Sequence, residues 1–311
     1  TEGTSNSYIA DRGAASYSFT ATIMGNGANG IIDEGKFEDA SGNILTKAGG
    51  ANIHPLSAKL LWQDTDELVE QVALVNGRVQ VKMGRSRGNA LIAVYDKANP
   101  NAEDAKVLWS WHLWCTAVPQ IIEYTASRYT GNEYKVMDRN LGATTSTPAL
   151  GTTQGLHYQF GRKEPFSGSL TYDGVRTILY DVRSSASEVE CTINESVTVA
   201  KSINTPNILR LRGMEGSWCE TSDMKYLWGN TETDNFYYPS STIKTIYDPC
   251  PVGYKVPPAD VLLVLCKGDE EIYGCWATDS EIEKGFYIKS RDKYSTTFYC
   301  DNAGVDDTKL I

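Results

Sequence analysis

The sequence is poor in histidine, in positive charge and in long apolar runs, and each shortage argues against a class of function. Its three histidines, His54, His112 and His157, stand far apart without the spacing of metal ligands. The formal net charge of −10 argues against a nucleic-acid partner and against adsorption to anionic membranes, since both need clustered Lys and Arg. The longest aliphatic run, Val261–Cys266, is too short to span a bilayer.

Cysteine is missing from the first hundred residues, and no two of the seven cysteines form a Cys-x-x-Cys pair. The sequence therefore does not fit a zinc ribbon or a thioredoxin. All seven cysteines stand at or after Cys115. Two interpretations stay open: one or two disulfides in the C-terminal half, or reduced and buried thiols.

The sequence also lacks the motifs of catalytic and cofactor sites. There is no Gly-x-Ser-x-Gly elbow. The run Gly25–Gly30 matches the dinucleotide fingerprint by spacing, but no amphipathic helix follows it, so we expect a turn. The pairs Glu164-Pro165 and Asp248-Pro249 are of a kind found in calcium lectins, yet neither is followed by Asn or Asp. The sequence predicts no catalytic residue, no metal and no cofactor.

The chain does contain 18 tyrosines and 27 glycines, a mixture that favours short strands and turns. Apolar and polar residues alternate over 17–23 and over 78–83, which is typical of half-buried antiparallel strands. Residues 88–95 are apolar at nearly every position, as in a central strand. Residues 107–115 carry three of the seven tryptophans and are expected to pair with 88–95 as a hairpin.

These patterns predict a β-rich, α+β chain of two domains: an antiparallel β-sandwich over 1–118 and a loop-rich domain over 119–311. A helix is expected after Pro257, because Val261, Leu262 and Leu265 share a face. The chain begins at Thr1 without methionine, so we expect that an export signal has been removed. The last residues read as a turn entering a strand, and we expect the natural protein to continue past Ile311.

Aromatic and polar residues interleave between residues 217 and 241. Aromatic faces stack on sugar rings, and carboxylates or amides bond to hydroxyl groups, so this segment could bind a glycan. The alternative is that the aromatic rings fill the core of a domain with few strands. The candidate ligand-binding residues are Trp218, Asp223, Trp228, Asn230, Asp234 and Tyr237.

Six segments, in order and with their spacing, resemble exported surface proteins of gut Bacteroidales. They are Gly88–Asp96, Val107–Trp114, Val136–Thr144, Gly155–Phe166, Leu227–Gly229 and Lys244–Pro257. The resemblance is to fimbrillin-like, Mfa-type pilus-tip and cell-surface adhesins with a C-terminal Fibrobacter major paralogous domain. It implies a C-type-lectin-like fold after residue 118, related to formylglycine-generating enzymes. The lectin calcium motif and the enzyme's paired cysteines are not found here, so neither activity is implied.

The resemblance leads us to expect a non-enzymatic adhesion protein that is exported to the cell surface, as a pilus-tip (fimbrial) component or an outer-membrane-associated surface lipoprotein that binds host or microbial ligands. Its partners would be other pilus or surface subunits and a glycan or protein ligand of unknown identity, without nucleic acid or a membrane span. A glycan-binding accessory protein for polysaccharide uptake is the main alternative. An enzyme of the formylglycine-generating type is a further alternative.

Overall fold

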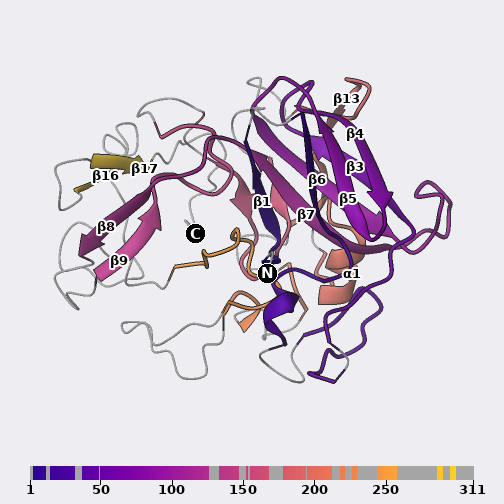
Figure 1. The fold of residues 1–311 in the computed structure, drawn as a ribbon. Helices are drawn as coiled ribbons and strands as arrows, with labels where there is room; N and C mark the ends of the chain where they lie inside the picture. Colours follow the sequence, from indigo (N-terminus) through magenta and orange to yellow (C-terminus); the bar gives the residue numbers. More distant parts are fainter. Residues whose placement is uncertain are drawn as a thin grey trace.

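The computed structural model describes residues 3–11, 15–31, 37–48, 50–125, 133–146, 152, 155–167, 178–193, 195–211, 218–220, 226–229, 244–257, 286–289 and 295–298. Within these residues the fold is β-rich and consists of several sheets (Figure 1). The predicted β-rich class is therefore confirmed. The helix expected after Pro257 lies outside the described residues.

The larger sheet has six strands in the order β1-β7-β6-β3-β12-β13. Their bounds are Ser7–Ala10 (β1), Ser57–Gln63 (β3), Gly88–Tyr95 (β6), Val107–Cys115 (β7), Ile178–Tyr180 (β12) and Ala186–Glu188 (β13). Strands β6 and β7 form the predicted antiparallel hairpin, with Gly88 opposite Cys115. Every residue of β6 is buried, as expected of a central strand that is covered on both faces.

The smaller sheet has three strands in the order β2-β5-β4, with bounds Ser16–Thr20 (β2), Val69–Val75 (β4) and Arg78–Met83 (β5). In β5, Val79, Val81 and Met83 are buried, whereas Gln80 and Lys82 are exposed, so the predicted alternation is confirmed. The two sheets pack their apolar side chains into one hydrophobic core.

The glycine run at 25–30 forms a turn with a short 3-10 helix, Gly27–Asn29, and not the start of an α-helix. The first glycine of the run is sterically required. Gly25 has φ +45°, and a Cβ atom there would lie 1.9 Å from the carbonyl oxygen of Ile246. Glycine at position 25 therefore allows this turn to lie directly against the backbone of Ile246.

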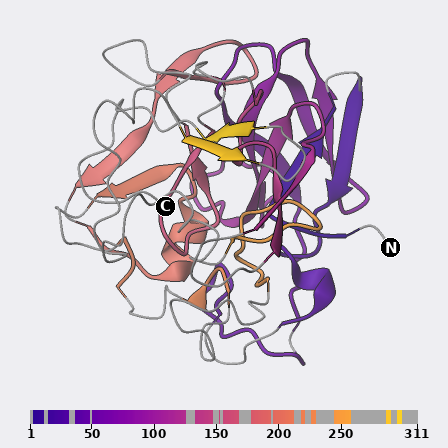
Figure 2. The ribbon, with the colours of Figure 1, turned by 90° about the vertical axis from the view of Figure 1, so that its left-hand side faces the viewer.

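The sheet and the core continue across residue 118. Strands β12 and β13 extend the larger sheet beyond β3, where Tyr180 pairs with Gln63. The main core also contains Ile203, Trp218 and Tyr247 beside side chains of the N-terminal strands. In Figure 2 the N-terminal strands lie on the right, and most of residues 178–211, in salmon, lies on the left. The boundary predicted near residue 118 is thus no boundary of sheet or core in the described residues.

The remaining elements are short. They are β8 (Ile121–Thr125), β9 (Glu133–Met137), β10 (His157–Tyr158), β11 (Pro165–Phe166), β14 (Glu190–Ile193), α1 (Val199–Asn204), β15 (Ile208–Leu211), β16 (Phe286–Lys289) and β17 (Ser295–Phe298). Helix α1 begins after Thr198, whose hydroxyl accepts a hydrogen bond from the Lys201 amide. Among the helices in the described part of the chain, none has the length and apolarity to cross a membrane.

Candidate functional site

Strand β7 organises the polar interior of the protein, because its two faces carry different chemistry. Trp109, Trp111 and Leu113 belong to the main hydrophobic core. Ser110 and His112 alternate with them and are also buried. Polar segments from distant parts of the chain meet these side chains. Trp109 and Trp111 are therefore packing residues.

An ionic cluster of Arg162, Lys163 and Glu164 lies against β7. The Glu164 carboxylate contacts the Arg162 guanidinium at 3.2 Å and the Lys163 ammonium at 2.6 Å, and all three side chains are almost completely buried. Lys163 Nζ donates to the Ser110 hydroxyl at 2.7 Å and lies 4.3 Å from the centre of the Trp109 ring. One carboxylate therefore serves two cations, and an aromatic face helps to stabilise the second one.

The electrostatics of the ionic cluster depend on Glu164. Burial lowers the pKa of Lys163, and the neighbouring Glu164 carboxylate opposes this shift. Burial lowers the pKa of Arg162 in the same way, again opposed by Glu164. The Arg162 guanidinium also donates to the carbonyl oxygens of Thr205 and Ile208 at 3.0 and 2.9 Å. The cluster thus connects β7 with the segment that follows α1.

The segment Val136–Thr144 docks beside β7 through backbone carbonyls. The indole of Trp114 donates to the Ala143 carbonyl at 3.0 Å, and the amide of Asn89 donates to the Gly142 carbonyl at 2.9 Å. Arg139 holds the carboxylate of Asp138 with two hydrogen bonds, at 2.8 and 3.0 Å. These contacts are structural, because each donor is already paired inside the protein.

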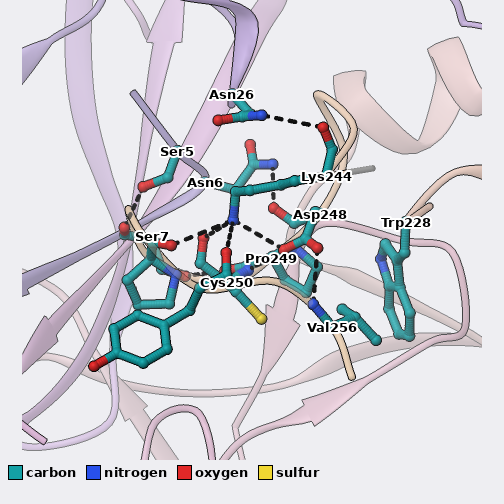
Figure 3. Close-up of polar contacts among 12 residues, drawn as sticks. Ser5, Asn6, Ser7, Asn26, Trp228, Lys244, Asp248, Pro249, Cys250 and Val256 are labelled. Atoms are coloured by element: carbon teal, nitrogen blue, oxygen red, sulfur yellow. Dashed lines mark hydrogen bonds and ion pairs between the residues drawn. The ribbon is translucent and has the colours of Figure 1, made fainter. Parts of the chain in front are cut away.

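The segment 244–256, here called the Lys244 loop, is folded around one ammonium group. The Lys244 side chain reaches into the centre of the loop (Figure 3). Its Nζ donates to carbonyl oxygens of the loop, namely those of Cys250 at 2.6 Å, Pro251 at 3.3 Å and Tyr254 at 2.7 Å. The Lys244 ammonium therefore satisfies three backbone carbonyls of the loop. Pro249 and Pro251 have no N–H group, so this part of the chain cannot pair its carbonyls in a regular sheet.

Asp248 completes the Lys244 loop from the opposite side. One carboxylate oxygen accepts from Lys244 Nζ at 3.0 Å and from the Cys250 amide at 2.8 Å. The other accepts from the Val256 amide at 2.8 Å. Asp248 is 0% exposed, so these partners replace the water that its charge would otherwise bind.

The N-terminal segment joins the Lys244 loop to β7. The Asn6 side chain donates to the carbonyls of Ile246 and Asp248 at 2.7 and 2.8 Å, and its Oδ1 accepts from the Trp109 indole at 2.9 Å. Ser7 donates to the Pro249 carbonyl at 2.5 Å (Figure 3). Strand β1 also pairs in parallel with β7. Asn6 and strand β1 therefore connect the larger sheet to the Lys244 loop, which follows some 240 residues later.

Four buried side chains, beginning with Ser7, are linked by polar contacts, and we call this row the His112 chain. Ser7 Oγ lies 3.0 Å from Nδ1 of His112, and Nε2 lies 2.9 Å from Oδ1 of Asn89. The Asn89 amide nitrogen donates to Asp64 Oδ2 at 2.7 Å. Because this nitrogen also donates to Gly142, Oδ1 of Asn89 is the acceptor, and Nε2 of His112 carries the proton.

The His112 chain has the connectivity of a catalytic relay but is closed to solvent. Burial lowers the pKa of His112 to about 3 and raises the pKa of Asp64 to about 6. At neutral pH the imidazole is therefore uncharged and Asp64 is ionised. Ser7 and His112 are each only 1% exposed, and the single hydroxyl proton of Ser7 lies between two buried acceptors, the Pro249 carbonyl and His112 Nδ1. The arrangement can hold three segments together, and it presents no reacting atom at the surface.

The candidate ligand residues divide into two groups. Trp218 and Trp228 are buried, at 4% and 6% exposure, and their indoles donate to the backbone carbonyls of Phe160 and Arg162 at 2.7 and 3.0 Å. These two rings pack in the interior and offer no open stacking face. The other four candidates, Asp223, Asn230, Asp234 and Tyr237, lie outside the described residues.

The described residues contain no group of three or more His, Cys, Asp or Glu side chains that could hold a metal ion. The two carboxylate–proline pairs are accounted for by protein partners, since Glu164 binds the ionic cluster and Asp248 closes the Lys244 loop. Cys115, Cys219 and Cys250 are buried thiols. No family model, no curated protein and no solved structure matches the chain.

Sequence reasoning missed Asn6, Ser7 and Asp64. Ser7 and His112 are 105 positions apart, and Ser7 and Pro249 are 242 positions apart. Short polar residues near a chain terminus carry no local pattern that indicates such partners. Only the parallel pairing of β1 with β7 brings them together.

The His112 chain leads to a prediction about pH. Unfolding restores the His112 pKa from about 3 to 6.5, so the unfolded state binds more protons in this range and the free energy of unfolding rises with pH. Asp64 has the opposite sign: its folded pKa of about 6 exceeds 3.8, so its contribution falls as pH rises. Each slope is about 1.4 kcal/mol per pH unit, and the two cancel between pH 3.8 and 6.

Replacing Asp64 with asparagine removes the contribution to stability that falls as pH rises and keeps the rising contribution of His112. We expect the free energy of unfolding of this variant to rise more steeply than that of the wild type between pH 4 and 6, by about 1.4 kcal/mol per pH unit. Urea titrations at several pH values measure the slope. The control is Asp104→Asn, which removes an exposed carboxylate paired with Lys97 and should not steepen it. Parallel curves for the Asp64 variant and the wild type would contradict the prediction.

Proposed function

We propose that this chain is a non-enzymatic adhesion protein of a bacterial cell surface, exported as a pilus-tip or outer-membrane-associated component. One observation carries the proposal. Five of the six segments that resemble fimbrillin-like adhesins make direct contacts with β7 or with its partner segments. Segments that recur together in order, and that bond to one another in the interior, are what a shared scaffold requires. The polar residues that these segments contribute are used for packing, which favours a structural role over catalysis.

We also propose that the part after residue 118 has a C-type-lectin-like fold of the Fibrobacter major paralogous type. The support is the Lys244 loop, because it matches the segment that leads into a helix in such domains. In this chain the loop is closed by Lys244 and Asp248. An experimental structure of the full chain with a helix following Pro257 is the expected result. A strand at that position would contradict the assignment.

Surface location is tested on the cells that encode the protein. Protease added to intact cells should degrade the chain, and antibodies should label the cell exterior. A deletion strain should lose adherence to host cells or to partner bacteria, and the complemented strain should regain it. Protease resistance in intact cells together with unchanged adherence would overturn the proposal.

A glycan-binding accessory role is the second candidate, and one observation favours it. Phe160 is 39% exposed and lies edge-on to Trp228, with 5.4 Å between the ring centres. An exposed ring held by a buried tryptophan is a suitable stacking surface for a sugar. Loss of polysaccharide uptake in the deletion strain, without any adhesion defect, would distinguish this role from adhesion.

Binding of a single sugar is expected to be weak, roughly millimolar, because one stacked ring gains little over the cost of immobilisation. We expect Tyr237→Ala and Asp234→Asn to reduce binding on a glycan array, since both lie in the candidate segment. Trp228→Ala is unsuitable, because loss of a buried indole costs about 3–5 kcal/mol of stability. Phe160→Ala is the comparison variant. If it alone loses binding, the ligand site lies at Phe160 and not within residues 217–241.

A further inference from the structure

In the described residues, β4 is the longest strand at an edge of the two larger sheets. The larger sheet ends at β1, whose outer side is bridged to Pro251, and at β13, which is three residues long. The smaller sheet ends at β2, with five residues, and at β4, with seven. In the described residues β4 pairs with β5 alone. Its outer edge therefore carries a row of backbone donors and acceptors without a neighbouring strand.

The side chains of β4 do little to protect this edge. The strand contains no proline and no lysine, the residues that usually block edge pairing. A bulge between Val69 and Gln71 leaves residues 71–75 as the regular part. Val72 and Leu74 pack against the core, although they remain partly exposed, and Val75 is 39% exposed. The ligand that fits such an edge is another β-strand.

We propose that β4 is a self-association edge, which pairs antiparallel with β4 of a second copy of this chain about a two-fold axis at Ala73. The two three-stranded sheets then form one continuous sheet. Val72 lies opposite the second copy's Leu74 on the core side, and Gln71 lies opposite its Val75 on the outer side. Each exposed apolar side chain of the strand thereby gains an apolar or uncharged neighbour.

The charges of the strand fit a second copy. Glu70 is the only charged residue of β4, and it lies outside the paired segment 71–75. It already contacts Lys82 of its own sheet at 2.6 Å. No like charges therefore face each other across the proposed edge. The net charge of −10 on each copy opposes association at long range, so the dimer should strengthen as salt screens this repulsion.

Analytical ultracentrifugation of the full chain tests the proposal with two matched variants. Gln71→Lys with Val75→Glu places opposite charges across the proposed edge, twice per dimer. Gln71→Lys with Val75→Lys places like charges there. Within one copy the two positions are roughly 13 Å apart, so both variants should have similar melting temperatures. The expected result is a salt-strengthened wild-type dimer, and a dissociation constant at least about 10-fold lower for the Lys/Glu variant than for the Lys/Lys variant.

Two results would overturn the proposal. One is a wild type that stays monomeric at high protein concentration in about 0.5 M salt, where charge repulsion is screened. The other is association that is equally strong in both variants, because it would place the contact elsewhere on the surface. The test does not depend on the adhesion proposal, since it uses purified protein alone.

Discussion

Replacing Glu164 with glutamine is expected to lower the free energy of unfolding by about 3–5 kcal/mol, the cost of leaving a buried charge without its partner. Glu164 is the carboxylate shared by Arg162 and Lys163, and none of the three side chains is more than 2% exposed. Glutamine keeps the size of the side chain but removes its charge, which leaves two cations in the interior. Chemical denaturation followed by tryptophan fluorescence measures the loss.

The matched control is Glu123→Gln, which removes the carboxylate of an exposed ion pair with Lys135. Solvent screens that pair, so little change is expected. A double-mutant cycle with Lys163→Met adds a second test. Removing one excess cation should recover part of the stability lost in Glu164→Gln, because the two residues are in direct contact. A loss for Glu164→Gln no larger than that of the control would show that the ionic cluster does not stabilise the fold.

Replacing Lys244 with methionine is expected to cost a similar amount, about 3–5 kcal/mol, because it leaves the buried Asp248 carboxylate without its cation. The carbonyls of Cys250 and Tyr254 lose their donor at the same time. The loss of structure should begin within the Lys244 loop. Hydrogen exchange should accelerate at the amides of Cys250 and Val256, since both donate to Asp248.

Lys59→Met is the comparison for this variant, because Lys59 Nζ makes one exposed hydrogen bond, to Asn101. Its exchange rates and stability should stay close to those of the wild type. If Lys244→Met melts at the wild-type temperature with unchanged exchange at Cys250, the ammonium group is not what holds the loop. A uniform increase of exchange over the whole sheet would instead show that the Lys244 loop and the sheet unfold as one unit.

The strands of the N-terminal part were predictable from sequence because side-chain alternation follows directly from strand geometry. The period of two at residues 78–83 reappears as alternating burial in β5. The unbroken apolar run at 88–95 reappears as the fully buried β6. Where both faces of a strand are covered, no polar position interrupts the run, and the sequence reports burial directly.

The boundary and the candidate site could not be predicted in the same way. The change of composition near residue 118 is real, yet β12 and β13 return to the first sheet after it. For Trp218 and Trp228 the sequence left glycan stacking and core packing both open, and in the structure their rings are packed and hydrogen-bonded inside. Composition averages over neighbours in sequence, whereas burial depends on neighbours in space.

The sequence by itself determined the β-rich class and the central hairpin of β6 and β7. These properties follow from local periodicity and residue type. Only the tertiary structure decided what the polar residues near β7 do. No local pattern marks Arg162, Lys163 and Glu164 as buried, and in the fold they are an interior ion cluster. The reason is that a charge is stabilised by its partners, and those partners come from segments that only chain folding brings together.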